Sequence, residues 1–150
     1  MGVKLGLDCK LYYCAAGIGG TPTWTEITAA REVTIPVSKG EADASTRGGG
    51  GWKATIGTLK DAAIDFELLY DPADAAAVAI LSAFLSGATI GLCAAHGPIA
   101  TAGTEYFKAD CQILKFEEKE PLDNVVTVAV TAKPTYSANQ PAFTTVAGGT

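Results

Sequence analysis

Alternation of apolar and polar residues marks the clearest strand in this chain. Every second residue between positions 64 and 70 is apolar: Ile64, Phe66, Leu68 and Tyr70. The residues between them include the acidic Asp65 and Glu67. A period of two is that of a strand with one buried face. The pattern therefore predicts a half-buried strand over residues 62–70.

Similar but shorter stretches predict a chain that is mainly β. The expected strands cover residues 4–14, 24–28, 31–37, 88–95, 105–117 and 125–133. Pro36 cannot donate a ladder hydrogen bond, so its strand is expected at a sheet edge or with a bulge. The apolar phase slips between Ile113 and Phe116, which predicts a second bulge. The last two strands flank a charged turn and should form a hairpin.

One segment changes to a helical period. Residues 72–86 carry apolar side chains at three- and four-residue spacing: Ala77, Ile80, Leu81, Phe84 and Leu85. Asp71 is the expected N-cap, Pro72 occupies the first helical position, and Gly87 ends the helix. The stripe predicts that this single helix packs against a sheet. We therefore expect a mainly β fold with one α-helix and two packed antiparallel sheets, as a β-sandwich or partial barrel.

Two segments lack any period. Residues 38–52 read S-K-G-E-A-D-A-S-T-R-G-G-G-G-W and hold almost no apolar side chain larger than Ala before the Trp, which predicts a long loop or a mobile hairpin. Residues 57–61 are expected to form a turn. Residues 134–150 are expected to be an extended tail, either disordered or docked on a neighbour. Without an internal repeat or linker, residues 1–150 are interpreted as one domain.

Composition narrows the functional classes. The net charge of −5 and the isoelectric point near 4.7 argue against tight binding of nucleic acid, which needs clustered Lys and Arg. The same charge suits a protein past which DNA moves without sticking. With 48% hydrophobic and only 18% charged residues, the chain has weakly polar surface available for contact with other chains.

Candidate chemistry is sparse. Cys9, Cys14, Cys93 and Cys111 show no zinc-ligand spacing, and the lone His96 has no nucleophile or carboxylate at a recognisable spacing. Asp71 and Asp74 are better explained by helix capping than as a metal pair. The glycines before Trp52 lack the spacing of a phosphate-binding loop. We predict no catalytic, cofactor or metal site, and no enzyme.

Targeting signals are equally sparse. The opening Met1-Gly2-Val3-Lys4 does not read as a secretory signal, which predicts a cytosolic origin with reduced thiols. The longest apolar stretch, residues 75–85, is too short to span a bilayer, so no membrane partner is expected.

The order of several features carries a family resemblance. A strand at residues 33–37 precedes Glu41-Ala42-Asp43-Ala44-Ser45-Thr46-Arg47, a glycine run with Trp52, the sequence G-T-L-K-D at 57–61, a strand ending in Tyr70-Asp71, and an Ala-rich helix. This order resembles the major tail tube proteins of long-tailed (siphovirus-type) phages and related prophages. The resemblance covers residues 33–87 well and residues 105–133 in outline.

The resemblance implies subunits that form hexameric rings, stacked into a tube with a continuous β-barrel wall through which DNA passes without specific binding. The expected partners are copies of the chain, a tape measure protein and a terminator, and the expected location is the virion tail after assembly in the host cytoplasm. The inter-subunit loop would comprise Glu41, Asp43, Thr46, Arg47, Gly48, Gly49, Gly50, Gly51 and Trp52. Residues expected on the tube wall or facing the lumen, away from the core, are Asp65, Glu67, Thr127 and Thr131.

Two other interpretations remain open from the sequence. One is another structural part of a virion or injection machine: a tail terminator, a decoration protein or the tube of a contractile system. The other is a β-barrel that binds a small ligand, which predicts a stable monomer with an aromatic-lined cavity.

Overall fold

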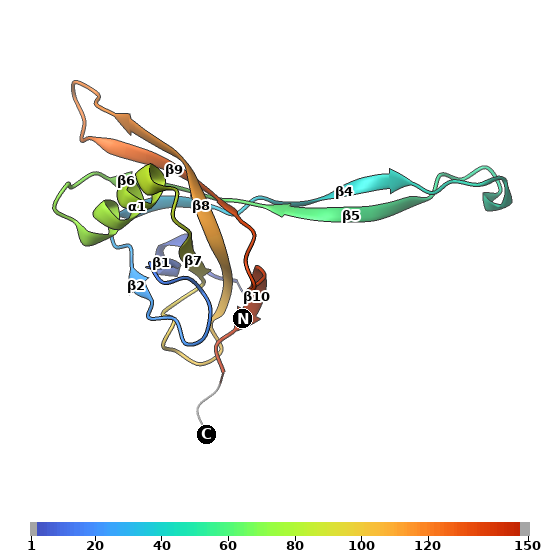
Figure 1. The fold of residues 1–150 in the computed structure, drawn as a ribbon, viewed down its shortest axis with the longest axis horizontal. Coiled ribbons are helices and arrows are strands. Elements are labelled where there is room, and N and C mark those ends of the chain that lie inside the picture. The colour runs from blue at the N-terminus through green and yellow to red at the C-terminus, as the bar shows by residue number, and fades with distance from the viewer. Residues whose placement is uncertain (1–2, 148–150) are drawn as a thin grey trace.

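The structure is a computed structural model that describes residues 3–147. It contains one α-helix, α1 (Ala75–Ser86), and two short 3-10 helices, η1 (Gly6–Asp8) and η2 (Arg47–Gly49). The strands are β1 (Lys10–Cys14), β2 (Thr25–Glu26), β3 (Ala30–Thr34), β4 (Val37–Asp43), β5 (Thr55–Ala62), β6 (Ile64–Leu69), β7 (Ile90–Ala95), β8 (Glu105–Lys119), β9 (Thr127–Pro134) and β10 (Ala142–Thr145). Figure 1 shows a folded body from which β4 and β5 project as a long arm.

The main sheet is antiparallel and has the order β2-β1-β7-β8-β9-β6-β3, with β10 beside β8. The long strand β8 belongs to two halves of this sheet. Cys111 pairs with Ile90 of β7 on one side and with Pro134 of β9 on the other. Before Cys111, β8 joins β7 and β10, and after it β8 continues beside β9. We call the part formed by β3, β6, β9 and the second part of β8 the four-stranded half-sheet.

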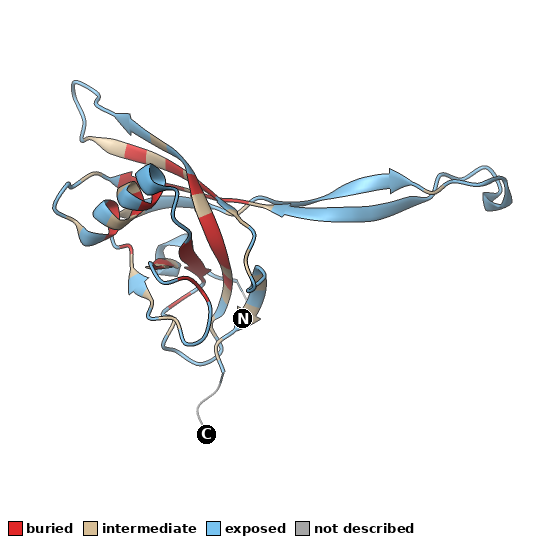
Figure 2. Ribbon diagram, in the orientation of Figure 1, coloured by how far each residue is buried: buried red, intermediate tan, exposed pale blue. Residues whose placement is uncertain are grey.

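Both halves of the main sheet contribute to one apolar core. Buried residues from β1, β6, β7, β8, β9 and α1 form a single cluster that includes Leu11, Phe66, Ile80, Leu92 and Val130. In Figure 2 the buried residues lie in the body, whereas the arm is exposed along its length. The predicted mainly β fold with one helix and two antiparallel sheets is confirmed. The second sheet is the two-stranded arm, and no closed barrel forms within the described chain. The arm is exposed, so the packing predicted between two sheets is found instead between the two halves of the main sheet.

The helix begins later than the sequence predicts. Asp74, not Asp71, is the N-cap, and its Oδ1 accepts a hydrogen bond from the Ala76 N–H at 3.4 Å. Asp71 instead accepts from the Ala73 N–H at 2.9 Å, so its carboxylate closes a turn before the helix. Gly87 ends α1 in the left-handed region, with φ 74°, as predicted.

The predicted apolar stripe of α1 is only partly buried. Ala77 and Ile80 are buried, but Leu85 is 73% exposed, and Ala83 lies against the core instead. Phe84 stacks on Phe116 of β8, with ring centroids 6.3 Å apart. The helix therefore covers the core side of the four-stranded half-sheet.

Most other strand predictions are confirmed. In β6, Ile64, Phe66 and Leu68 are buried, and β8 has its register shift between Ile113 and Lys115. The strand β3 lies at a sheet edge and ends at Thr34, before Pro36. At the N-terminus the prediction is too long, because residues 6–8 form η1 and β1 begins only at Lys10.

The prediction of a long loop over residues 38–52 is wrong. Residues 37–43 form β4 and pair with β5, so the mobile-hairpin alternative had the correct connectivity. Residues 57–61 lie within β5 and do not form a turn. Neither strand could be recognised from the apolar pattern of the sequence, because the side chains of both contact solvent on both faces and need no apolar alternation.

The tail after residue 134, expected to be disordered or docked on a neighbour, is instead partly docked on its own chain. Strand β10 pairs with the start of β8 in the same chain, with Phe143 opposite Phe107 and their ring centroids 4.7 Å apart. Residues 148–150 of the predicted tail lie outside the described part of the chain.

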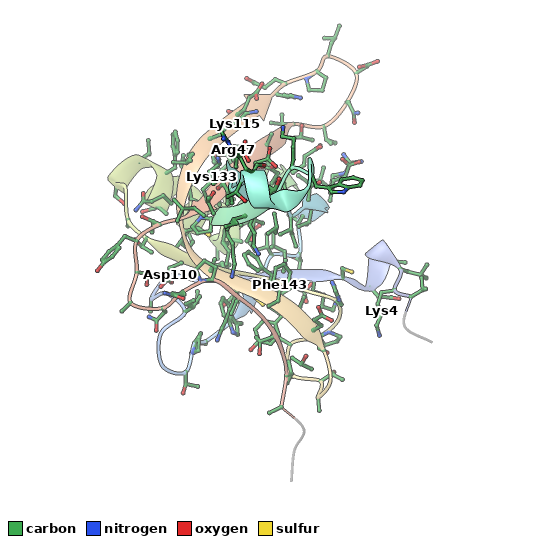
Figure 3. All side chains as sticks on the ribbon, turned by 90° about the vertical axis from the view of Figure 1, so that its right-hand side faces the viewer. Lys4, Arg47, Asp110, Lys115, Lys133 and Phe143 are labelled. Carbon is green, nitrogen blue, oxygen red and sulfur yellow. The ribbon has the colours of Figure 1, made fainter. Side chains whose placement is uncertain are left out.

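A buried carboxylate attaches two loops to this strand. Asp110, in β8, is only 5% exposed. Its Oδ1 accepts from the Ile18 N–H at 2.7 Å, and its Oδ2 accepts from the Ser137 hydroxyl at 2.6 Å. These two hydrogen bonds join the turn after β1 and the segment before β10 to the centre of the body, where Figure 3 labels Asp110.

We predict that Asp110→Ala lowers the free energy of unfolding by about 2–3 kcal/mol, because the buried Ile18 N–H loses its charged acceptor. Chemical denaturation measures this change. Glu105→Ala, on the exposed start of the same strand, is the matched control and should change stability by less than about 0.5 kcal/mol. Equal effects of the two substitutions would contradict the assigned role of Asp110.

The four thiols divide by burial into one exposed group, Cys9, and three buried groups, Cys14, Cys93 and Cys111. Burial raises the pKa of Cys93 and of Cys111 to about 12. Because the thiolate is the reactive form, neither thiol should react at pH near 8 in the folded protein. We expect a thiol reagent to modify one cysteine rapidly and all four after unfolding. Cys9→Ser should remove the rapid phase, and a second rapid thiol would contradict the burial of Cys14, Cys93 or Cys111.

Candidate functional surfaces

The four-stranded half-sheet has one face that neither the helix nor the other half-sheet covers. Cross-strand pairs place Asp65 opposite Thr131, and Thr131 opposite Lys115. Because paired residues share a face, the side chains of these rows point away from the core. We call this surface the polar face, and its members are Arg31, Asp65, Glu67, Lys115, Glu117, Lys119, Thr127, Thr131 and Lys133.

Most charged residues of the polar face are in ion pairs. The Arg31 guanidinium lies 3.8 Å from the Glu67 carboxylate, and the Lys115 ammonium lies 2.8 Å from that of Glu117. The hydrogen bond between Lys115 and Glu117 lowers the pKa of Glu117 and raises that of Lys115, and the opposite charges of the two groups act in the same directions. At the base of the arm Lys133 lies 3.9 Å from Asp61. The face thus carries four basic and three acidic side chains, and five of these seven are in ion pairs.

The arm comprises residues 37–62, and it stands clear of the core. All residues of β4 are exposed, and so are all of β5 except Ala62. Its exposed apolar side chains include Ile56, Leu59 at 86% and Trp52 at 83%. An isolated two-stranded hairpin is only marginally stable in water. Exposed apolar residues on such an element are typical of a surface that is covered in an assembly.

The tip of the arm is ordered by local hydrogen bonds. The Ala54 N–H donates to Ser45 Oγ at 2.9 Å, and the Ser45 N–H donates to Asp43 Oδ1, also at 2.9 Å. Gly50 and Gly51 have φ 66° and 89°, a region that side chains rarely adopt. Two of the four consecutive glycines are therefore required by the turn itself.

The sequence-predicted residues fall into two separate groups. Asp65, Glu67, Thr127 and Thr131 are together on the polar face, all at intermediate exposure. Glu41 and Asp43 lie on β4, whereas Thr46, Arg47, the four glycines and Trp52 form the tip of the arm. Figure 3 looks along the arm toward the body, with Arg47 at its near end.

Sequence reasoning missed the second strand of the arm and its lysines. Lys60 of β5 is directly opposite Lys39 of β4, and Leu59 is its exposed neighbour. The signal was two stretches of similar length on either side of a glycine-rich turn, which is typical of a hairpin.

Among residues 3–147, no group of three or more His, Cys, Asp or Glu side chains is placed to hold a metal ion. Over the same residues, no helix is long and apolar enough to cross a membrane.

Comparison with known families identifies the chain. The family model described as phage tail tube protein matches residues 10–135. The chain belongs to the phage tail tube protein family. Its members are structural proteins of the virion, which agrees with the family resemblance of the sequence. No curated protein matches this tail tube protein at a significant level.

Solved structures share the fold of this tail tube protein. The tail of an empty gene transfer agent particle, computed with C6 symmetry, is 16% identical, covers 95% of this chain and 99% of its own, and superposes with a TM-score of 0.73. The SPP1 tail tube is 14% identical over 87% of this chain and 75% of its own, with a TM-score of 0.66. A chain of the anti-feeding prophage baseplate is 6% identical, covers 97% of this chain and 98% of its own, and superposes with a TM-score of 0.70.

Proposed function

We propose that this tail tube protein forms hexameric rings that stack into a tube, with the polar face lining the lumen. The observation that carries the proposal is that the four-stranded half-sheet has an unpaired edge on each side. The symmetry reported for the gene transfer agent tail supports six copies per ring. The role is structural, and no catalytic step is assigned to any residue.

The two edges lie on β3 and β8. Within the described residues, β3 pairs only with β6, so its outer edge has no strand partner. β7 pairs with β8 only as far as Cys111, so the same side of β8 from Leu114 to Lys119 has none. Open edges are templates for pairing with another chain. Because the two edges are different, their contact is head-to-tail and can close by rotation into a ring.

A ring closed in this way would place the polar face on one side of a continuous barrel. Asp65, Glu67, Thr127 and Thr131 would then face the lumen. Balanced ion pairs there favour the passage of DNA without retention, because retention requires unpaired Lys and Arg on the phosphates. The helix covers the core on the opposite side, so it would lie on the outside of the tube.

The same proposal includes the wider assembly. We propose that residues 1–150 act as one unit, that subunits assemble in the host cytoplasm, and that the finished tube belongs to the virion tail. A tape measure protein inside the tube and a terminator at its end are the expected partners. The support for these points is membership in the tail tube family. The tube of a contractile injection machine is the second candidate, favoured by fold likeness to the anti-feeding prophage chain.

Cross-linking tests the ring. We would introduce Val33→Cys on the β3 edge and Leu114→Cys on the β8 edge, in a Cys9→Ser background, because both positions are exposed. A short bifunctional thiol reagent should give a ladder of products that ends at the hexamer. Either cysteine alone should give no ladder, which is the matched control. A ladder that stops at the dimer, or its absence in assembled protein, would contradict head-to-tail pairing of these edges.

A further inference from the structure

Two like charges oppose each other on the arm. Lys39 and Lys60 are cross-strand partners, so their side chains share a face of the two-stranded sheet. The Lys39 side chain extends over Gly57, where a Cβ would meet its Cδ at 3.1 Å. Glu41 follows on the same strand, but no ion pair joins either lysine to a carboxylate among residues 3–147. Directly opposed like charges destabilise a strand pair, so this arrangement favours an external anionic group.

A complementary surface lies at the far end of the same strands. The hairpin between β8 and β9 ends in residues 118–124, which we call the acidic turn; it exposes Glu118, Glu120 and Asp123, with Lys119 as its one basic residue. Within the described residues none of these carboxylates is in an ion pair. Leu122, in the same turn, is fully exposed.

Strand register places the arm and the acidic turn at opposite ends of the four-stranded half-sheet. Ile64, which follows the arm, pairs with Ala132, whereas Leu69 pairs with Thr127 beside the acidic turn. Figure 1 shows the β8–β9 hairpin and the arm projecting from opposite sides of the body. A contact between opposite ends of identical molecules is head-to-tail, and by translation it generates a stack.

We infer that the Lys39–Lys60 pair of one copy docks on the acidic turn of a copy in the next ring. The inference rests on the proposed function, since it names the contact that joins stacked rings. Charge complementarity points to a second copy as the partner. Residues 37–62 carry four basic and three acidic side chains, whereas the whole chain has a net charge of −5, so the arm is more basic than the rest of the molecule. Apolar side chains support the same contact, because Ile56 and Leu59 of the arm and Leu122 of the turn are exposed.

Charge reversal tests the contact. Lys39→Glu with Lys60→Glu, and separately Glu118→Lys with Glu120→Lys, should each raise the protein concentration needed for tube growth by at least about tenfold, because like charges then face each other. The four substitutions combined in one chain should restore growth toward the wild-type value. Tube length by electron microscopy and assembled mass by sedimentation are the measurements. Lys4→Glu, on the exposed N-terminal segment, is the single-charge control and should have no effect.

A neutral variant separates docking from simple repulsion. Lys39→Gln with Lys60→Gln removes the like-charged pair without adding a new one. If the two lysines have no partner in the tube, this variant should have a more stable arm and form unchanged tubes. The inferred contact predicts weaker tube growth instead. If the wild type forms tubes and no variant changes tube growth, or if the combined variant does not recover tube growth, only the ionic contact is overturned. Wild-type protein that forms neither rings nor tubes would overturn the proposed function as well.

Discussion

A chain in which Asn-Gly replaces residues 38–61 is expected to fold as the wild type does and to form no tubes. The shortened connection joins Val37 to Ala62, which are already paired at the base of the arm, and Asn-Gly favours the two-residue hairpin turn. No residue of the deleted segment belongs to the apolar core. Thermal unfolding should therefore place its stability within about 1 kcal/mol of the wild type.

The deletion should prevent assembly because the arm extends beyond the body. It exposes Trp52, Ile56 and Leu59, which need a covering surface, and it carries the opposed lysines. A milder variant, Trp52→Ala alone, removes one of these exposed side chains and leaves the paired strands in place. Tubes of normal length from the deletion variant would show that the arm does not join subunits.

Ile80→Ala is expected to lower the free energy of unfolding by about 2–5 kcal/mol. Ile80 is fully buried where α1 meets the sheet, so its truncation leaves a cavity that the surrounding strands cannot fill. Leu85→Ala is the control on the same helix; Leu85 is 73% exposed, so its loss should change stability by less than about 0.5 kcal/mol. Denaturant unfolding of the monomer measures both.

This pair of variants also tests the corrected face of the helix. The sequence places Ile80 and Leu85 on one apolar stripe, whereas the structure buries only the first. Similar losses from both substitutions would contradict the observed orientation of α1.

Elements that bury one face were predictable from sequence. The alternation of Ile64, Phe66 and Leu68 specifies β6 because only one register puts all three in the core. The bulge in β8 was predictable for the same reason, because the apolar residues Ile113 and Phe116 both face the core and are out of phase with strict alternation. The helix was predictable as an element, but two aspartates could cap it, and the choice of Asp74 depends on backbone geometry that sequence does not specify.

Elements without a buried face were not predictable in this way. Strands β4 and β5 contact solvent on both faces, so they lack alternation, and the sequence pattern predicts a loop and a turn in their place. Strand β10 has only four residues, and its pairing depends on the distant β8 and on the anchor at Asp110. Such tertiary contacts leave little trace in a local pattern.

The candidate surfaces show the same division. Asp65 and Glu67 were placed away from the core by alternation, and the structure adds their neighbours Lys115 and Arg31. The net negative charge of the chain suggested only that DNA could pass without sticking, and the structure adds that the polar face carries both signs of charge, mostly in ion pairs. Part of the excess acid lies on the acidic turn, where we infer that it serves contact between rings.

Electron microscopy of the purified protein across a range of concentrations tests the central claim most directly. The account predicts six-fold rings at low concentration and stacked tubes with an open lumen at higher concentration. Protein that remains strictly monomeric at the highest concentration would contradict it.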